Sequence, residues 1–194
     1  ALYAGLSTTE VLQYNLSVPR NVFWKALLRD EGFTIGRLDS RYRGIDRQAA
    51  GEQFDHDPAL SAWNHAFSPA INDYLRKVLG FQTDLEYWVL RAIRPWNFEN
   101  DQTGEQLRRA MAQNPYLHVF VQAGYFDGGT DYFSAKYTLW QLDPSGKLSD
   151  RLFFKGYRSG HMMYLRLEDL AVANDDLRRF IQQALEAAQQ PARY

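Results

Sequence analysis

Two residues of this sequence, Asp127 and His161, have the types and the spacing to form a proton-relay pair. Asp127 follows the apolar stretch 117–123 by four residues, and His161 follows a second stretch, 151–156, by five. If the two stretches are neighbouring parallel strands, their carboxyl ends lie at one edge of the sheet and bring both side chains to one place. A carboxylate that orients a histidine is the supporting pair of a nucleophilic triad.

The same two residues also fit structural roles, and the sequence leaves both interpretations open. Asp127 begins an Asp-Gly-Gly string that is a favourable turn, and His161 lies in a loop where its ring can simply be hydrogen-bonded. A nucleophile is harder to find, because the chain contains no Gly-x-Ser-x-Gly elbow. The nearest string, 5–9, begins a predicted helix. Ser134 lies within another predicted helix and Ser159 adjoins the histidine loop, so neither is a convincing nucleophile.

The second half of the chain predicts the elements that would position this pair. Residues 117–123 and 151–156 are short, apolar and rich in β-branched or aromatic side chains, which is typical of buried strands. Helical spacing of apolar residues predicts helices over 103–113, 131–142 and 167–188. An order of helix, strand, helix, strand, helix predicts an α/β fold with parallel strands.

The first half of the chain is composed of helices and loops. Ser7 to Glu10 form a capping box at the start of a short helix, and a second helix is predicted over 19–30, ending before Gly32. Residues 33–57 are expected to form a polar loop. The aromatic stretch 88–98 has no clear period.

A longer helix is predicted to begin at Asp57 and Pro58 and to run toward Gly80. Because Pro69 falls inside it, we expect two helices or a kink at that point, with Ser68 as a new N-cap.

Several other residues could do chemistry, although each has a simpler explanation. Asp131 is a rival to Asp127 as the acid, but at the first position of a helix it more readily serves the helix dipole. The triplet 55–57, Asp-His-Asp, resembles a metal-binding string, yet adjacent residues on a loop seldom converge on one ion. His65 and His118 are expected to be structural.

Aromatic and basic side chains give two further open alternatives. Trp88, Trp96 and Phe98 could line a substrate cleft, although large aromatic residues more often pack in a core. A group of charges of both signs in the polar loop predicts a salt-bridge network, while one of its arginines could instead bind a peptide carboxylate. The members are Arg37, Asp39, Arg41, Arg43, Asp46 and Arg47.

The composition excludes several classes of protein. A formal net charge of −1, spread over both halves, carries no signature of nucleic-acid binding. No apolar run reaches the roughly 20 residues of a membrane span, and residues 1–10 lack the basic and apolar pattern expected of a signal peptide. Without cysteine there can be no disulfide, thiolate nucleophile or cysteine-bound zinc.

The chain resembles the serine carboxypeptidases, peptidase family S10, in their bacterial branch. The resemblance is carried most specifically by the aspartate loop together with the Gly-His-Met string, and it extends over nearly the whole chain. The matching segments are 114–117, 124–127 and 160–164 in the second half and 3–7, 27–30, 36–42 and 72–75 in the first.

This resemblance implies a fold and two regions. The family has an α/β-hydrolase fold with a helical insertion. Residues 1–100 would then be a mainly helical cap or insertion region. Residues 101–194 would be the C-terminal strand-helix-strand-helix part of the core, with its last two parallel strands and their flanking helices.

The resemblance also implies residue roles. Asp127 matches the triad acid, His161 the triad base, and Met162 a residue lining the pocket for the leaving C-terminal residue. The family's serine nucleophile, its oxyanion glycine and its carboxylate-binding residues have no counterpart in 1–194. The chain is therefore expected to be the C-terminal portion of such an enzyme and inactive on its own, with a peptide as substrate, no metal or organic cofactor, and a periplasmic or secreted location.

Alternative functions remain open at this point. The same triad serves acyl transfer as well as hydrolysis, and a non-catalytic domain that binds peptides or proteins would need no nucleophile. With only two strands evident, an unpaired sheet edge should be exposed. The isolated chain is therefore expected to self-associate through this edge, to be only marginally stable, or to pair with the missing N-terminal part of the same enzyme.

Overall fold

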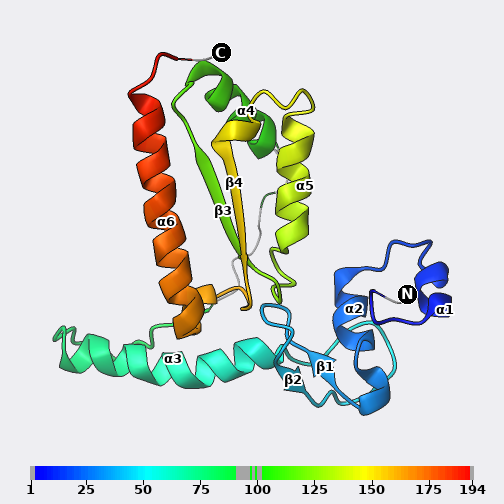
Figure 1. The fold of residues 1–194 in the computed structure, drawn as a ribbon. Coiled ribbons are helices and arrows are strands. Elements are labelled where there is room, and N and C mark those ends of the chain that lie inside the picture. The colour runs from blue at the N-terminus through cyan, green and yellow to red at the C-terminus, as the bar shows by residue number, and fades with distance from the viewer. Residues whose placement is uncertain (1–2, 91–96, 98, 100–101, 193–194) are drawn as a thin grey trace. The chain divides into compact units, whose positions relative to one another are not determined.

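The computed structural model describes residues 3–90, 97, 99 and 102–192, and the chain forms two compact units, Ala1–Trp96 and Asn97–Tyr194. The first unit is helical with one small hairpin, and the second places helices around a parallel sheet (Figure 1). The prediction of an α/β protein with a parallel pair of strands is confirmed at this level. None of the helices in the described part of the chain combines the length and the hydropathy of a membrane-spanning segment.

The first unit begins with two short helices. Helix α1 (Thr8–Gln13) has the predicted capping box, in which Ser7 and Glu10 bond each other's backbone N–H groups. Helix α2 (Arg20–Ala26) ends earlier than predicted. The chain then continues through a 3₁₀ turn, η1 (Arg29–Glu31), to Gly32, whose φ of 78° is the left-handed conformation that favours glycine at a helix end.

The prediction of a plain loop over 33–57 is wrong, because the segment contains an antiparallel hairpin. Strands β1 (Thr34–Ile35) and β2 (Arg43–Gly44) pair, and Gly36 N–H bonds the Tyr42 carbonyl at 2.9 Å. Strands of two residues are too short to show an alternating pattern, so their sequence gave no signal.

Helix α3 (Pro58–Lys77) is a single helix, so the predicted division into two helices is wrong. Asp57 caps it as predicted, through bonds from the Ala59 and Leu60 N–H groups at 3.0 and 3.2 Å. Pro69 removes one main-chain bond of the helix, and that single loss is tolerated here. Ser68 is not an N-cap: its carbonyl accepts a bond from the Asn72 side chain at 2.8 Å.

The second unit matches the prediction closely. Its elements are α4 (Thr103–Gln113), β3 (Val119–Gly124), α5 (Tyr132–Leu142), η2 (Ser149–Arg151), β4 (Leu152–Tyr157), η3 (Met163–Leu165) and α6 (Leu167–Ala188). Strands β3 and β4 are parallel and in register from Val119 opposite Leu152 to Gly124 opposite Tyr157. Both strands therefore end at the same edge of the sheet.

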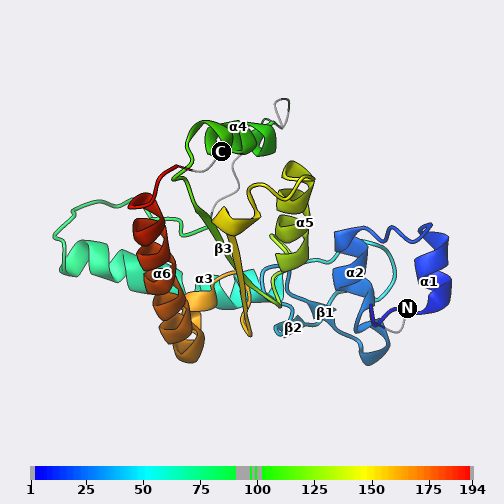
Figure 2. The same cartoon turned by 45° about the horizontal axis from the view of Figure 1, so that its top comes forward.

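Helices α5 and α6 cover opposite faces of this sheet (Figures 1 and 2). Phe180 of α6 contacts the rings of Phe120 and Phe153, which are opposite each other in the ladder. The next residue along, Phe154, faces the other way, and Lys136 of α5 lies 6.0 Å from its ring centre. The alternation of side chains along each strand thus assigns one helix to each face.

A buried polar chain fixes α6 to the sheet near the end of β4. The Gln122 side chain donates to the Tyr157 hydroxyl at 2.9 Å, and this hydroxyl donates to Asp176 at 3.0 Å. Burial chiefly, together with the neighbouring Asp176 carboxylate, raises the pKa of Tyr157 to about 12, while the Gln122 bond and Arg179 act to lower it. Tyr157 therefore stays protonated as the donor that joins strand to helix.

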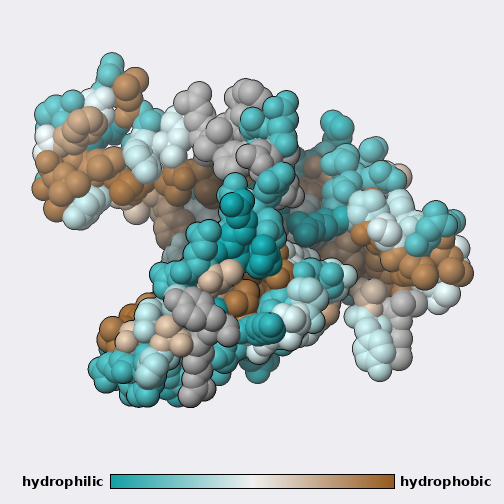
Figure 3. Space-filling view, turned by 90° about the horizontal axis from the view of Figure 1, so that it is seen from above, coloured by the Kyte–Doolittle hydropathy of each residue, from teal (hydrophilic) through white to brown (hydrophobic). Residues whose placement is uncertain are grey.

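The sheet has two strands within the described residues, and its outer edges carry no further paired strand. Large apolar side chains are also exposed on both covering helices, and Figure 3 shows hydrophobic patches beside hydrophilic ones on one face of the molecule. The exposed apolar side chains of these helices include Phe133, Tyr137 and Trp140 on α5 and Leu167, Leu177, Ile181 and Leu185 on α6. Parallel sheets are normally flanked and covered more completely than this.

Candidate active site

The structure brings Asp127 and His161 into direct contact at the carboxyl edge of the sheet. His161 Nδ1 lies 2.8 Å from Asp127 Oδ2. The Asp127 side chain is 3% exposed, whereas that of His161 is 43% exposed. The carboxylate is therefore held in the protein and the imidazole lies at its surface, which is the disposition that an acid–base pair requires.

The two loops that carry the pair are joined by an extension of the β ladder. Beyond the last paired residues, Tyr125 N–H bonds the Tyr157 carbonyl at 2.9 Å and Phe126 N–H bonds the Ser159 carbonyl at 3.0 Å. A Cβ on Gly124 would collide with the Ser159 and Gly160 carbonyl oxygens, so only glycine permits this approach. The two loops are thus held in fixed register close to Asp127 and His161.

Asp127 accepts hydrogen bonds on both of its oxygens. Oδ1 accepts the Gly129 N–H at 2.8 Å and the Thr130 N–H at 3.1 Å, while Oδ2 accepts the Thr130 hydroxyl at 2.7 Å. The Asp-Gly-Gly string is therefore a turn closed by its own aspartate and also the support of His161. The two interpretations of the sequence describe one structure.

These contacts keep the carboxylate ionised. Burial acts to raise the pKa of Asp127, but the hydrogen bonds from Thr130, His161 and the backbone of residues 129–130 outweigh it and hold that pKa below its ordinary range. The stability that these bonds contribute is present above the ordinary pKa of about 4 and is lost as the pH falls through the lowered pKa.

Within the described residues, His161 is hydrogen-bonded to Asp127 and Thr130, both through Nδ1, and no bond is present at Nε2. The serines considered as nucleophiles lie elsewhere. Ser134 bonds Asp131, and the Ser159 hydroxyl is buried without a partner. The described residues therefore hold a carboxylate against one imidazole nitrogen of His161 and leave the other, Nε2, without a hydrogen bond.

The remaining predicted site residues have structural positions. Asp131 is the N-cap of α5 and accepts the Ser134 N–H at 2.8 Å, as its place at the helix start predicted. Met162 is partly buried directly after His161 and is the N-cap residue that precedes η3. His118 Nδ1 lies 2.9 Å from the Tyr116 carbonyl, and His65 is exposed on α3.

The Asp-His-Asp triplet of residues 55–57 does not form a metal site. Asp57 caps α3, and Asp55 accepts the Arg47 N–H at 2.7 Å. No group of three metal-ligating side chains occurs among the residues that the structure describes. Of the three aromatic residues considered for a cleft, Trp88 is 62% exposed and so is not in a core, while Trp96 and Phe98 lie outside the described residues.

The polar loop contains ion pairs, but with different partners from those expected. Arg41 pairs with Asp39 at 2.7 Å, as the network prediction requires. Asp46, however, pairs at 2.6 Å with Lys25 of α2, which sequence reasoning missed because a lysine on an apolar helix face gave no signal. Arg37 pairs with Asp57 at the end of the loop, and Arg43 pairs with Glu31 outside it.

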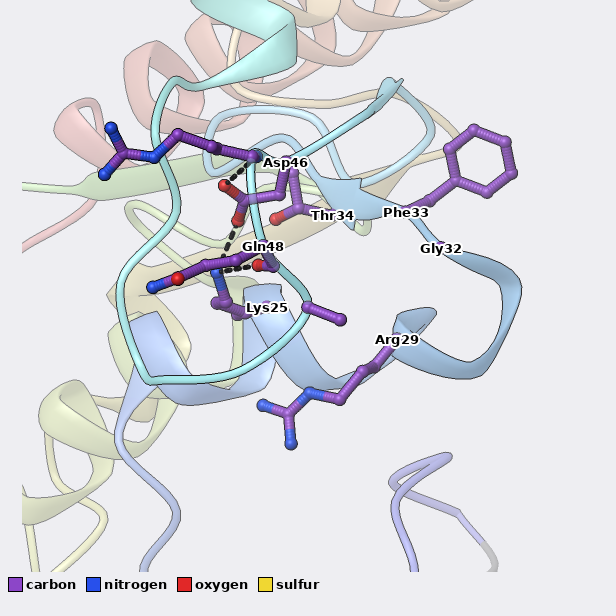
Figure 4. Close-up of a pocket in the computed structure, with 9 residues that line it drawn as sticks. Lys25, Arg29, Gly32, Phe33, Thr34, Asp46 and Gln48 are labelled. Carbon is purple, nitrogen blue, oxygen red and sulfur yellow. Dashed lines mark hydrogen bonds and ion pairs between the residues drawn. The ribbon is translucent and has the colours of Figure 1, made fainter.

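The Lys25–Asp46 pair lines a small cavity of about 170 Å³ (Figure 4). Lys25 Nζ also donates to the Gln48 carbonyl at 2.8 Å, and the phenyl ring of Phe33 points away from the pair. Cavities that hold small molecules are usually about 300–1,000 Å³. We therefore interpret the pair as a structural tie between α2 and the polar loop.

Substituting methionine for Lys25 is expected to lower the free energy of unfolding by roughly 3 kcal/mol, because it leaves a carboxylate that is 7% exposed without its cation. Lys77→Met is the matched control, since its pair with Asp73 is largely exposed and worth less than about 1 kcal/mol. Urea denaturation of both variants measures the difference. Equal losses would show that the Lys25 pair does not hold the unit together.

Comparison of the chain with protein-family models, with curated proteins and with solved structures finds no match.

Proposed function

We propose that this chain carries the acid and the base of a serine-type carboxypeptidase whose nucleophilic serine lies outside residues 1–194. The observation that carries the proposal is the 2.8 Å contact between the buried Asp127 carboxylate and Nδ1 of the partly exposed His161. Many loop aspartates only close turns, but this one closes its turn and also binds the histidine. The carboxypeptidase assignment within this chemistry rests on the resemblance of the 124–127 and 160–164 segments.

In the proposed reaction, His161 Nε2 takes the proton of the serine hydroxyl as the serine oxygen attacks the peptide carbonyl. The carbon–nitrogen bond breaks, the acyl group stays on serine, and the imidazolium gives its proton to the leaving amine. A water molecule, deprotonated by the same nitrogen, then releases the acid and restores the serine. Asp127 stays ionised throughout and stabilises the imidazolium.

The fold supports this proposal in a second way. In an α/β-hydrolase the strands β3 and β4 would be the last of a larger parallel sheet, and the helices α5 and α6 would lie against further elements. The unpaired sheet edges and the exposed apolar residues of both helices are consistent with such neighbours. Residues 1–100 would then belong to the cap or insertion region, and Met162 to the pocket for the leaving residue.

Labelling with a fluorophosphonate tests the proposal, because the probe reacts with a serine only when a base and an oxyanion hole activate it. We expect the protein as naturally expressed to be labelled at a serine outside 1–194, and His161→Ala to abolish the labelling. Asp131→Asn should leave it within about twofold, since asparagine also caps a helix.

Two results would contradict the proposal. Labelling of a serine within 1–194 that His161→Ala prevents would place the nucleophile in this chain. A folded natural protein that the probe does not label would favour a non-catalytic binding domain. Product analysis with competing amines then separates hydrolysis from acyl transfer.

A further inference from the structure

The contact between Asp127 and His161 has a third member, Thr130. Its Oγ1 lies 2.7 Å from Asp127 Oδ2 and 3.1 Å from His161 Nδ1. The distance between Asp127 Oδ2 and His161 Nδ1 is 2.8 Å. The three polar atoms therefore form a closed triangle of hydrogen-bond distances. Sequence reasoning missed Thr130, although aspartate and threonine side chains in turns often bond groups of their own loop.

The protons of this triangle can be counted. Asp127 is ionised and can only accept, so the Thr130 hydroxyl donates to Oδ2 and turns its lone pairs toward His161 Nδ1. Nδ1 then faces two oxygens that present lone pairs. A protonated Nδ1 is attracted to both, whereas an unprotonated Nδ1 would be repelled by both.

The Thr130 hydroxyl is not needed to close the turn. The turn is closed at the other carboxylate oxygen, Oδ1, by the N–H groups of Gly129 and Thr130. The hydroxyl acts only on Oδ2, the oxygen that faces the imidazole. The Thr130 N–H therefore helps to close the turn, whereas the Thr130 hydroxyl acts on the carboxylate oxygen that contacts His161.

We propose that Thr130 is a positioning residue that holds the neutral His161 in the tautomer with the proton on Nδ1. That tautomer leaves a lone pair on Nε2, which is the nitrogen that a base needs. The inference concerns the base of the proposed function and rests on it for its catalytic meaning, but the tautomer itself can be measured without any reaction.

Nitrogen NMR of the ¹⁵N-histidine-labelled natural protein tests this role, with the His161 signals assigned through His161→Gln. In the unmodified protein and in Thr130→Ser, which keeps the hydroxyl, we expect a protonated Nδ1 and a bare Nε2. In Thr130→Val, which keeps the shape but has no hydroxyl, the share of the Nε2-protonated tautomer should rise about tenfold, as the loss of one hydrogen bond to Nδ1 predicts. Exchange of the Nδ1 proton with water should quicken by a similar factor.

The outcomes separate this role from the proposed function. An unchanged tautomer and exchange rate in Thr130→Val would show that Asp127 alone sets the tautomer. A Thr130→Ser protein as altered as Thr130→Val would show that the methyl group matters rather than the hydroxyl, and would also overturn the proposal. If the tautomer shifts as expected in a protein without peptidase activity, the positioning role stands and the carboxypeptidase assignment fails. Thr130→Ala serves as the variant without a hydroxyl if Thr130→Val does not fold.

Discussion

If the proposed carboxypeptidase function holds, replacing His161 with alanine is expected to reduce kcat/KM of the natural protein for a blocked dipeptide by at least about 10⁴-fold. In the proposed reaction the imidazole takes the serine proton and returns it to the leaving amine. The other side chain that bonds Asp127 Oδ2 among the described residues is that of Thr130, whose hydroxyl is not a base. Triads that lose one member retain only the catalysis supplied by the oxyanion hole and substrate binding.

Asp127→Asn should have a similarly large effect, about 10⁴-fold. Asparagine can present its amide N–H₂ where Oδ2 now accepts, and this would favour the wrong tautomer of His161. Because the isosteric amide can still accept the Gly129 and Thr130 N–H bonds, the loop should keep its shape. Steady-state hydrolysis, with unfolding measured in parallel, distinguishes a lost function from a lost fold.

Asp131→Asn is the matched control, since it changes the other carboxylate of the same loop. Asp131 caps α5, and asparagine caps as well, so activity should change by less than about twofold. If Asp131→Asn were the crippling change and Asp127→Asn were tolerated, the assignment of the acid would be wrong.

Much of the second unit could be predicted from sequence because its signals are local and strong. Helix α6 has apolar residues at helical spacing over its whole length, and α4 was predicted with its observed bounds. The meeting of Asp127 with His161 followed from topology alone, since the carboxyl ends of neighbouring parallel strands share one edge. That prediction needed the element order, not the position of any side chain.

Other features depend on contacts that no local pattern records. The β1–β2 hairpin is too short to alternate, and the continuity of α3 through Pro69 depends on whether the chain can tolerate one missing bond. The burial of Lys25 depends on Asp46, which lies in a different element. A hydrogen bond between Thr130 and Asp127 could have been expected from the sequence, because the two residues lie in one turn. The distance from Thr130 to His161 could not, because it depends on how the two loops meet.

Gly124→Ala is expected to be the most damaging of the small substitutions in the second unit. The added Cβ would overlap the main-chain oxygens of Ser159 and Gly160, and main chain cannot turn aside as a side chain can. We expect a loss of roughly 2–3 kcal/mol in the free energy of unfolding. If the proposed function holds, displacement of the histidine loop by about 1 Å should also cost about 100-fold in peptidase activity.

Gly156→Ala provides the informative comparison, because the nearest atoms that its Cβ would meet belong to the side chain of Tyr125, which is 57% exposed and can move toward solvent. Gly104→Ala is the control for the substitution itself, since its Cβ would contact the Leu142 side chain, and it should change stability by less than about 1 kcal/mol. Urea denaturation ranks the three variants, and the hydrogen bond of His161 Nδ1 is followed by NMR.

The Gly124→Ala variant tests what holds His161 against Asp127. If the Asp127–His161 contact depends on the ladder beyond the strands, Gly124→Ala should break it while the helices stay folded, because Phe126 N–H must then leave the Ser159 carbonyl. If Gly124→Ala instead leaves the contact at Nδ1 unchanged, the aspartate turn and Thr130 suffice to hold His161. The two loops would then be positioned by their own hydrogen bonds rather than by the close approach of their backbones.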